Sequence, residues 1–78
     1  MAKVVLPELG DGIKKATVSY WYFKVGERLK ENDDLVELTT DKTSFNLPSP
    51  CSGVLSEITI SEGKEVKVGD TLGLIEQS

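Results

Sequence analysis

The two halves of this 78-residue chain repeat each other at an offset of 37 residues. Residues 25–30 (VGERLK) match residues 62–67 (EGKEVK), and residues 32–35 match residues 69–72. Each copy reads as a long strand, a glycine turn, a short strand, a second turn and another strand. Two such halves can bury their apolar faces on each other about a pseudo-twofold axis. The repeat therefore predicts two packed antiparallel sheets.

Strand signals run along the whole chain, and no segment shows sustained helical periodicity. Short runs of Val, Ile, Leu, Thr and aromatic residues are separated by Gly, Asp, Asn and Pro, a spacing typical of an all-β sandwich or barrel. The predicted strands cover residues 3–6, 16–23, 28–30, 35–40, 43–47, 53–60, 65–67 and 72–76.

Length and composition limit what holds this fold together. A chain of 78 residues makes one small domain, which we assign to residues 1–78. Cys51 is the only cysteine and the sequence has no histidine, so neither an internal disulfide nor a Cys/His zinc site can form. Strand pairing and side-chain packing must supply the stability, and the unpaired cysteine suits a reducing compartment.

Charge and hydropathy exclude two classes of partner. Thirteen acidic residues against nine basic residues give a net charge of −4, which disfavours binding to nucleic acid. No apolar run approaches the roughly 18–20 residues that a transmembrane helix needs, so we expect no membrane partner.

The segment around Lys42 predicts a tight β-hairpin. Residues 35–40 fold back on residues 43–48 with Asp41 and Lys42 as a two-residue loop, which gives one apolar and one polar face. The expected facing pairs are Thr40–Thr43, Leu38–Phe45, Val36–Leu47, Glu37–Asn46 and Thr39–Ser44.

Lys42 is an unexpected residue for the apex of such a loop. Two-residue hairpin loops favour Asn-Gly or Asp-Gly because their backbones often need positive φ. A lysine that breaks this local rule is a hint of function. The repeat places its counterpart at position 79, so we expect the hairpin tip to lie opposite the two ends of this chain.

Three further positions carry structural predictions. Strict alternation cannot bury both Val18 and Trp21, so we expect a β-bulge between them, with Trp21 in the core. Gly53 is expected where a bulky side chain would hinder a tight turn. Cys51 reads as a small apolar residue.

The sequence resembles the lipoyl domain of 2-oxoacid dehydrogenase complexes from about residue 3 to residue 76. The resemblance rests on Trp21 and on the segments LPELGDGI (6–13), ATV (16–18), VGE (25–27), DLVEL (34–38), TDKT (40–43), LPSP (47–50), GV (53–54), EG (62–63) and VGDTL (68–72). It implies a flattened β-barrel or sandwich of two four-stranded antiparallel sheets with quasi-twofold symmetry. Asp11 stands where relatives usually carry Glu, and Cys51 stands where a small apolar residue is more usual.

The resemblance also implies a role for each site residue. Lys42 would carry lipoate in amide linkage, and no residue of this fragment would be catalytic. The modifying and partner enzymes would recognise the hairpin and the loop of residues 8–15. The expected recognition residues are Asp41, Thr43, Glu37, Glu8, Gly10, Asp11 and Gly12.

By the same resemblance, the domain is a swinging-arm carrier and not an enzyme, in a parent chain that is a dihydrolipoyllysine-residue acyltransferase. Its partners would be a thiamine-dependent 2-oxoacid decarboxylase, the acyltransferase core of the parent chain, a dihydrolipoyl dehydrogenase, and a lipoate ligase or lipoyl transferase. The domain would be monomeric, in a bacterial cytoplasm or a mitochondrial matrix. The pattern favours pyruvate as the 2-oxoacid, through residues 16–18 and 48–50.

Two alternatives keep the fold but change the function. A biotinyl carrier domain flanks its lysine with methionines, whereas Asp41 and Thr43 flank Lys42 here. An unmodified interaction domain usually has a long insertion in the hairpin, whereas the connection here is two residues. An autonomous enzyme would need a nucleophile–base pair or a metal cluster, and the sequence offers neither.

Overall fold

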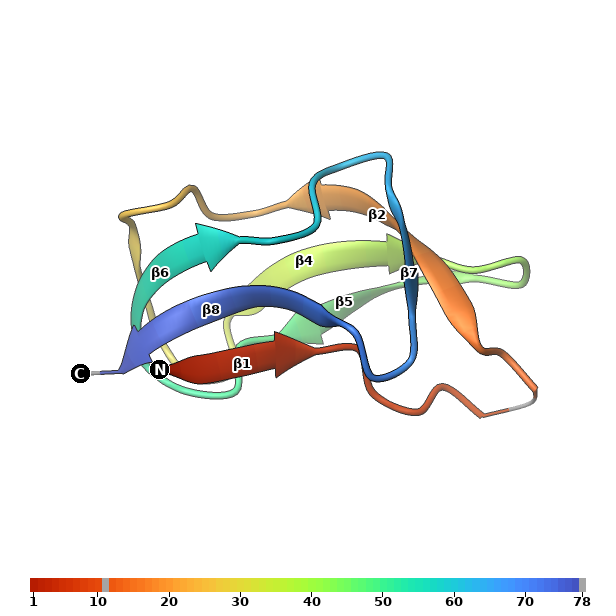
Figure 1. The fold of residues 1–78 in the computed structure, drawn as a ribbon, viewed down its shortest axis with the longest axis horizontal. Coiled ribbons are helices and arrows are strands. Elements are labelled where there is room, and N and C mark those ends of the chain that lie inside the picture. The colour runs from red at the N-terminus through yellow and green to blue at the C-terminus, as the bar shows by residue number, and fades with distance from the viewer. Residues whose placement is uncertain (11, 78) are drawn as a thin grey trace.

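Eight strands form two four-stranded antiparallel sheets in the computed structural model, which describes residues 1–10 and 12–77 (Figure 1). The strands are β1 (Ala2–Val5), β2 (Lys15–Trp21), β3 (Arg28–Leu29), β4 (Asp34–Thr39), β5 (Ser44–Pro48), β6 (Gly53–Ile58), β7 (Glu65–Lys67) and β8 (Thr71–Gln77). Within the described residues, no helix has the length and apolar character needed to cross a membrane.

The strand order of the two sheets follows the sequence repeat. One sheet has the order β1-β8-β6-β3 and the other has the order β5-β4-β2-β7. An offset of 37 residues relates β2 to β6, β3 to β7 and β4 to β8, and β5 occupies in its sheet the place of β1. This arrangement confirms the predicted quasi-twofold symmetry. In the part of the chain that is described, the two ladders stay separate, so the fold is a sandwich and not a closed barrel.

Backbone hydrogen bonds between the halves obey the same symmetry. The Gly26 amide donates to the Leu55 carbonyl at 2.8 Å, and the Gly63 amide donates to the Val18 carbonyl, also at 2.8 Å. Both donors and both acceptors are 37 residues apart. Because each glycine turn bonds to a strand of the other half, neither repeat completes its own hydrogen bonding.

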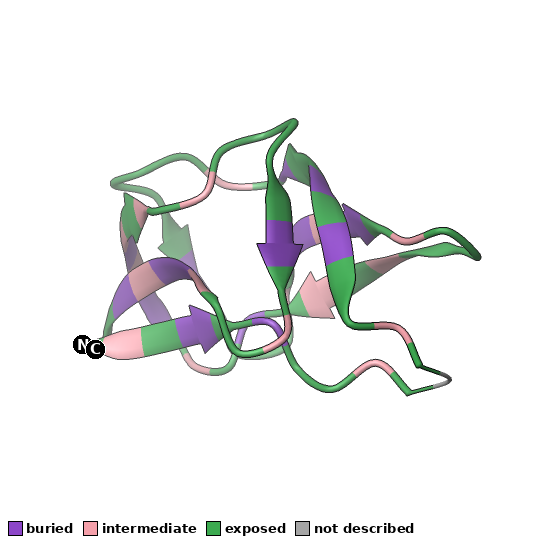
Figure 2. Ribbon diagram, turned by 45° about the vertical axis from the view of Figure 1, so that its right-hand side comes forward, coloured by how far each residue is buried: buried purple, intermediate pink, exposed green. Residues whose placement is uncertain are grey.

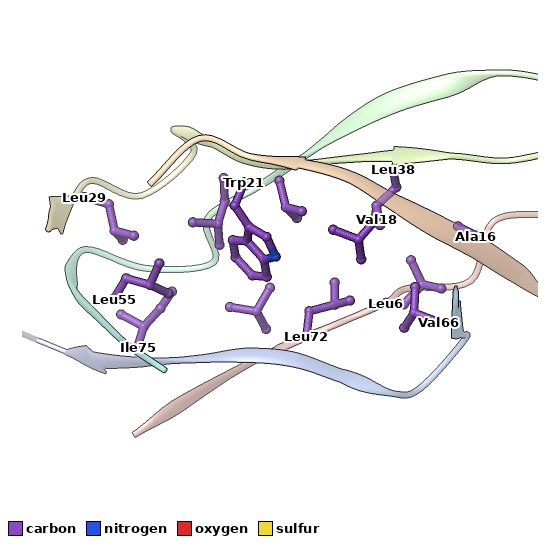
Figure 3. Packing of buried hydrophobic residues seen from close by; sticks show 13 residues of the cluster. Leu6, Ala16, Val18, Trp21, Leu29, Leu38, Leu55, Val66, Leu72 and Ile75 are labelled. Carbon is purple, nitrogen blue, oxygen red and sulfur yellow. The ribbon is translucent and has the colours of Figure 1, made fainter. Parts of the chain in front are cut away.

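The core lies between the sheets and is continuous along the molecule (Figures 2 and 3). Trp21 is 7% exposed and its ring projects into this space, where Nε1 donates to the Ile60 carbonyl at 2.9 Å. Val18 is fully buried, and the register with β4 shifts between Val18 and Tyr20. The predicted bulge and the core position of Trp21 are therefore confirmed. The buried apolar residues are Val4, Leu6, Ala16, Val18, Trp21, Leu29, Leu35, Val36, Leu38, Leu55, Val66, Leu72 and Ile75.

All eight predicted strands are present; β1, β3 and β4 end one residue earlier than expected, and β2 and β6 end two residues earlier. β2 stops at Trp21 and β6 stops at Ile58. After β6, the amides of Thr59 and Ile60 both donate to the single carbonyl of Leu72, at 2.9 and 3.2 Å. Two donors on one acceptor cannot continue a regular ladder, so the strand ends there.

The β4–β5 hairpin and the chain ends lie at opposite ends of the molecule. The domain measures 35 × 20 × 17 Å, and the hairpin projects from one end of its long axis while β1 begins and β8 ends at the other (Figure 1). This confirms the placement that the repeat predicted for the hairpin tip.

Candidate functional site

The hairpin has the predicted register. Every expected pair within the β4–β5 ladder is observed, and the Thr40 amide donates to the Thr43 carbonyl at 2.7 Å, closing the loop. The observed ladder pairs are Val36–Leu47, Glu37–Asn46, Leu38–Phe45 and Thr39–Ser44. Asp41 and Lys42 form the apex, and both are exposed. Val36 and Leu38 are fully buried, which anchors the base of the hairpin in the core.

The expectation that Lys42 breaks a turn rule is wrong. Among the described residues other than glycine, only Asn32 has positive φ, so Asp41 and Lys42 keep ordinary backbone angles. A left-handed conformation costs a residue with a Cβ roughly 1–2 kcal/mol, and this loop avoids that cost. The turn needs no glycine because a side chain supplies part of its hydrogen bonding.

That side chain is Thr40. Its Oγ1 accepts hydrogen bonds from the amides of Thr43 at 3.1 Å and Lys42 at 3.3 Å, and it donates to the Thr43 carbonyl at 2.9 Å. The residue is half-buried and directly follows β4. This role of Thr40 was not predicted from the sequence, although Ser and Thr hydroxyls often bond to backbone groups a few residues away in turns.

A groove separates the hairpin from the segment that leads into β2. Its volume is about 310 Å³ and it is open to solvent. The lining residues are Gly12, Ile13, Lys14, Lys15, Ala16, Thr17, Thr39, Thr40, Asp41, Lys42 and Glu65. The end of the predicted recognition loop therefore lies beside the lysine hairpin.

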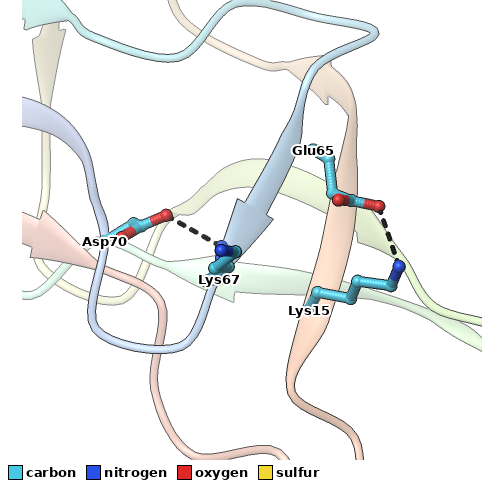
Figure 4. Close-up of polar contacts among 4 residues, drawn as sticks. All are labelled: Lys15, Glu65, Lys67 and Asp70. Atoms are coloured by element: carbon cyan, nitrogen blue, oxygen red, sulfur yellow. Dashed lines mark hydrogen bonds and ion pairs between the residues drawn. The ribbon is translucent and has the colours of Figure 1, made fainter.

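Lys15, which lines the same groove as Lys42, forms an ion pair. Lys15 Nζ lies 3.3 Å from Glu65 Oε2 across the β2–β7 pair (Figure 4). Both side chains are more than half exposed, so the pair contributes little stability. Among the described residues, no carboxylate lies within ion-pair distance of Lys42 Nζ.

The other predicted recognition residues are less closely grouped. Gly12 and Asp41 line the groove together with Lys42, and Thr43 is exposed next to the apex. Glu8 and Gly10 are exposed on the loop, outside the groove lining. Asp11 lies outside the described residues.

Glu37 sits in the middle of β4, away from the hairpin tip. It pairs with Tyr20 on one side and with Asn46 on the other. Tyr20 and Tyr22 are exposed on this face with their rings edge to face at 5.1 Å, and the Tyr22 hydroxyl donates to Asn46 Oδ1 at 2.9 Å. The sequence showed the aromatic run but not that its two tyrosines face solvent.

Comparison with known proteins places this hairpin in a family. Residues 2–75 match the biotin/lipoyl domain model, described as "biotin-requiring enzyme". This chain belongs to the biotin/lipoyl domain family. The lipoyl domain of the 2-oxoglutarate dehydrogenase complex from Azotobacter vinelandii superposes with a TM-score of 0.80 at 30% identity, and the alignment covers 99% of this chain and 98% of that one.

Several curated relatives of this lipoyl domain are acyltransferase components. A succinyltransferase component of the 2-oxoglutarate dehydrogenase complex from Rickettsia typhi is 35% identical over 75 residues, which are 96% of this chain and 19% of the relative. An acetyltransferase component of the pyruvate dehydrogenase complex from Acholeplasma laidlawii is 41% identical over 71 residues, 91% of this chain and 13% of the relative. The chain thus spans less than a fifth of the length of these proteins.

Members of the lipoyl domain family bind the cofactor lipoate covalently on a lysine in these complexes. The fold extends to proteins of other chemistry. A single-chain, multi-domain long-chain acyl-CoA carboxylase has the same fold with a TM-score of 0.75 at 22% identity, over 91% of this chain and 8% of that one.

Proposed function

We propose that Lys42 carries lipoate and that this lipoyl domain serves as a mobile acyl carrier in a 2-oxoacid dehydrogenase complex. The observation that supports the proposal is the position of Lys42. It is exposed at the apex of the β4–β5 hairpin, at the far end of the long axis from both ends of the chain.

The site fits the chemistry of amide formation on a lysine. A ligase has to reach the Nζ atom and take a proton from it, which requires an exposed amine without a competing ion pair. Lys42 is exposed and has no ion-pair partner among residues 1–10 and 12–77, whereas Lys15 is paired with Glu65. The strands below the apex hold Lys42 in a fixed direction, because Val36 and Leu38 are buried in the core.

When attached, the dithiolane ring of lipoate supplies the acyl-carrying and redox chemistry. The residues of this chain supply presentation. They hold the attachment point at the tip of a rigid hairpin, at one end of a domain that is 35 Å long. The tip can therefore enter a partner while the two ends of the chain stay outside. Tethering then raises the effective concentration of the carried group at each active site.

The proposed partners follow from that role. They are a thiamine-dependent 2-oxoacid decarboxylase, the acyltransferase core of a parent chain and a dihydrolipoyl dehydrogenase. The relatives include succinyltransferases of 2-oxoglutarate complexes and acetyltransferases of pyruvate complexes, so they do not single out pyruvate. The proposal therefore names the class of 2-oxoacid dehydrogenases.

Modification in vitro tests the attachment site. The 78-residue chain is incubated with a lipoate ligase, lipoate and ATP, and the product is measured by intact mass and mapped by peptide sequencing. We expect one lipoyl adduct, on Lys42, none in Lys42→Ala, and an unchanged adduct in Lys24→Ala. An adduct on Lys14, Lys15 or Lys24 in the wild-type chain would contradict the proposal.

Two further reactions separate the remaining alternatives. Biotin ligase with biotin and ATP should leave the chain unmodified, whereas biotin on Lys42 would favour the biotinyl carrier. The lipoylated chain should then gain an acyl group from a decarboxylase component supplied with its 2-oxoacid. Comparing pyruvate with 2-oxoglutarate in this assay identifies the complex that the domain serves.

A further inference from the structure

The Thr40 side chain replaces one backbone bond of the hairpin loop. One bond of the closing pair runs between main-chain atoms, from the Thr40 amide to the Thr43 carbonyl at 2.7 Å. The Thr43 amide donates to Thr40 Oγ1 at 3.1 Å, and the Lys42 amide donates to the same oxygen at 3.3 Å. A single hydroxyl therefore holds the backbone of the apex residue and of the residue that follows it.

We propose that Thr40 is a positioning residue for the modification of Lys42, with its hydroxyl holding the lysine backbone in the geometry that a lipoate ligase accepts. The inference rests on the proposed function, since it assumes that Lys42 is the residue modified. Thr40 touches neither lipoate nor the reacting amine in this role. It acts through the main chain of Lys42.

The physical argument starts from the sequence of the loop. Asp41 and Lys42 provide no glycine, and neither residue has positive φ, so the loop does not take the usual mirror-image turn of two-residue hairpins. Without the Thr40 hydroxyl, the amides of Lys42 and Thr43 would turn to water and the apex would sample several conformations. An enzyme that accepts only one of them would then bind less tightly, in proportion to the competent fraction.

A serine variant and a threonine outside the groove serve as controls. Thr40→Val keeps the shape of the side chain and removes the hydroxyl, and Thr40→Ser restores the hydroxyl. Thr59 follows β6, outside the groove lining, and its hydroxyl donates to the Thr71 carbonyl at 2.6 Å. Thr59→Val therefore removes a backbone-bonded hydroxyl of the same kind without touching the hairpin.

The test is the rate of lipoylation as a function of domain concentration, with a lipoate ligase, lipoate and ATP. For Thr40→Val we expect KM for the domain to rise roughly tenfold with kcat little changed, because a saturating concentration of the domain offsets the smaller competent fraction. Thr40→Ser should stay within about twofold of wild type, and Thr59→Val should match wild type.

Each outcome decides one question. If Thr40→Val has the wild-type KM, or if Thr40→Ser is as poor a substrate as Thr40→Val, the hydroxyl does not position the lysine. A general loss of folding would instead lower the thermal midpoint of Thr40→Val and reduce the active fraction, which the serine variant and a melting curve reveal. A wild-type chain that is not modified on Lys42 refutes the proposed function itself and this inference with it.

A second measurement tests the contact without any ligase. In NMR spectra of the unmodified chain, the amide shifts of Lys42 and Thr43 should depend more steeply on temperature in Thr40→Val than in wild type or Thr40→Ser. Equal temperature coefficients in all three proteins would show that Thr40 Oγ1 does not hold these amides in solution.

Discussion

Glu62 accepts a hydrogen bond from the backbone amide of Trp21, with 2.8 Å between the nitrogen and Oε2. The β2–β7 ladder ends at Thr17 of β2, so no residue of β7 pairs with Trp21. The Glu62 carboxylate accepts the hydrogen bond of the Trp21 amide in place of a strand carbonyl. The repeat equivalent of Glu62 is Val25, which has no such group. This contact is a departure from the symmetry, and it ties the connection between β6 and β7 to the strand that carries the core tryptophan.

Removing the Glu62 carboxylate should leave the Trp21 amide without a protein partner. We expect Glu62→Ala to lower the free energy of unfolding by about 1 kcal/mol, the typical net contribution of a protein hydrogen bond, because Glu62 is exposed. Glu62→Gln keeps an acceptor oxygen and should lose less. Urea titration followed by tryptophan fluorescence measures both variants.

Glu57→Ala is the control for Glu62, because it removes an exposed carboxylate from the same half of the chain. It should change stability by less than about 0.5 kcal/mol. Equal losses for Glu57→Ala and Glu62→Ala would mean that general charge effects, and not the bond to Trp21, govern the result.

Gly53 allows the first residue of β6 to approach β8 closely. A Cβ on Gly53 would lie 2.2 Å from the Glu76 carbonyl oxygen, a backbone atom that cannot move alone. We expect Gly53→Ala to cost roughly 3 kcal/mol, near the upper end of overpacking effects. Thermal unfolding followed by circular dichroism should show a large fall in Tm, with loss of folding as the extreme case.

Gly63→Ala separates this steric effect from the general cost of replacing a glycine. A Cβ there meets no atom within 4 Å, but φ is +87°, so only backbone strain of about 1 kcal/mol is expected. A Gly53→Ala protein as stable as Gly63→Ala would contradict the steric argument.

The sequence predicted the fold well because several independent patterns agreed. The alternation of Val36 and Leu38 fixed the hairpin register, and the conflict between burying Val18 and Trp21 revealed the bulge. The offset of 37 residues then related the two sheets. These features depend on side-chain periodicity, which is visible in one dimension.

Other features depend on contacts between distant segments and could not be predicted in this way. The role of Gly53 was expected in a turn, but the structure shows a close approach to the backbone of Glu76, 23 residues further along the chain. The hydrogen bond from the Trp21 amide to the Glu62 carboxylate spans 41 residues. The general preference for glycine in two-residue loops gave a wrong expectation for this hairpin, because the Thr40 hydroxyl accepts a hydrogen bond from the loop backbone.

Asp33 and Asp70 should contribute equally to stability. Each carboxylate accepts a hydrogen bond at 2.9 Å from the amide three residues before it, at Lys30 and Lys67 respectively, and the second of these is drawn in Figure 4. We expect Asp33→Ala and Asp70→Ala each to lose about 1 kcal/mol. The double variant should lose the sum within about 0.5 kcal/mol, since the two turns share no partner.

Asparagine variants check that the carboxamide oxygen can replace the carboxylate at these turns. Asp33→Asn and Asp70→Asn should retain most of the stability in urea titrations, because the acceptor remains. A loss at one turn several times larger than at the other would show that the repeat does not extend to the energetics of its turns.

Asn32 occupies the position that Gly69 holds in the second repeat, and its φ of 74° lies in the left-handed region like that of Gly69, at 93°. Asparagine tolerates this region better than other residues with a Cβ.

We therefore expect Asn32→Gly to change the free energy of unfolding by less than about 0.5 kcal/mol, because relief of strain offsets the greater freedom of the unfolded chain. Asn32→Ala should lose about 1 kcal/mol, and Gly69→Ala a similar amount. Urea midpoints of the three variants decide the matter, and an Asn32→Ala protein as stable as wild type would show that this turn can take another backbone conformation without cost.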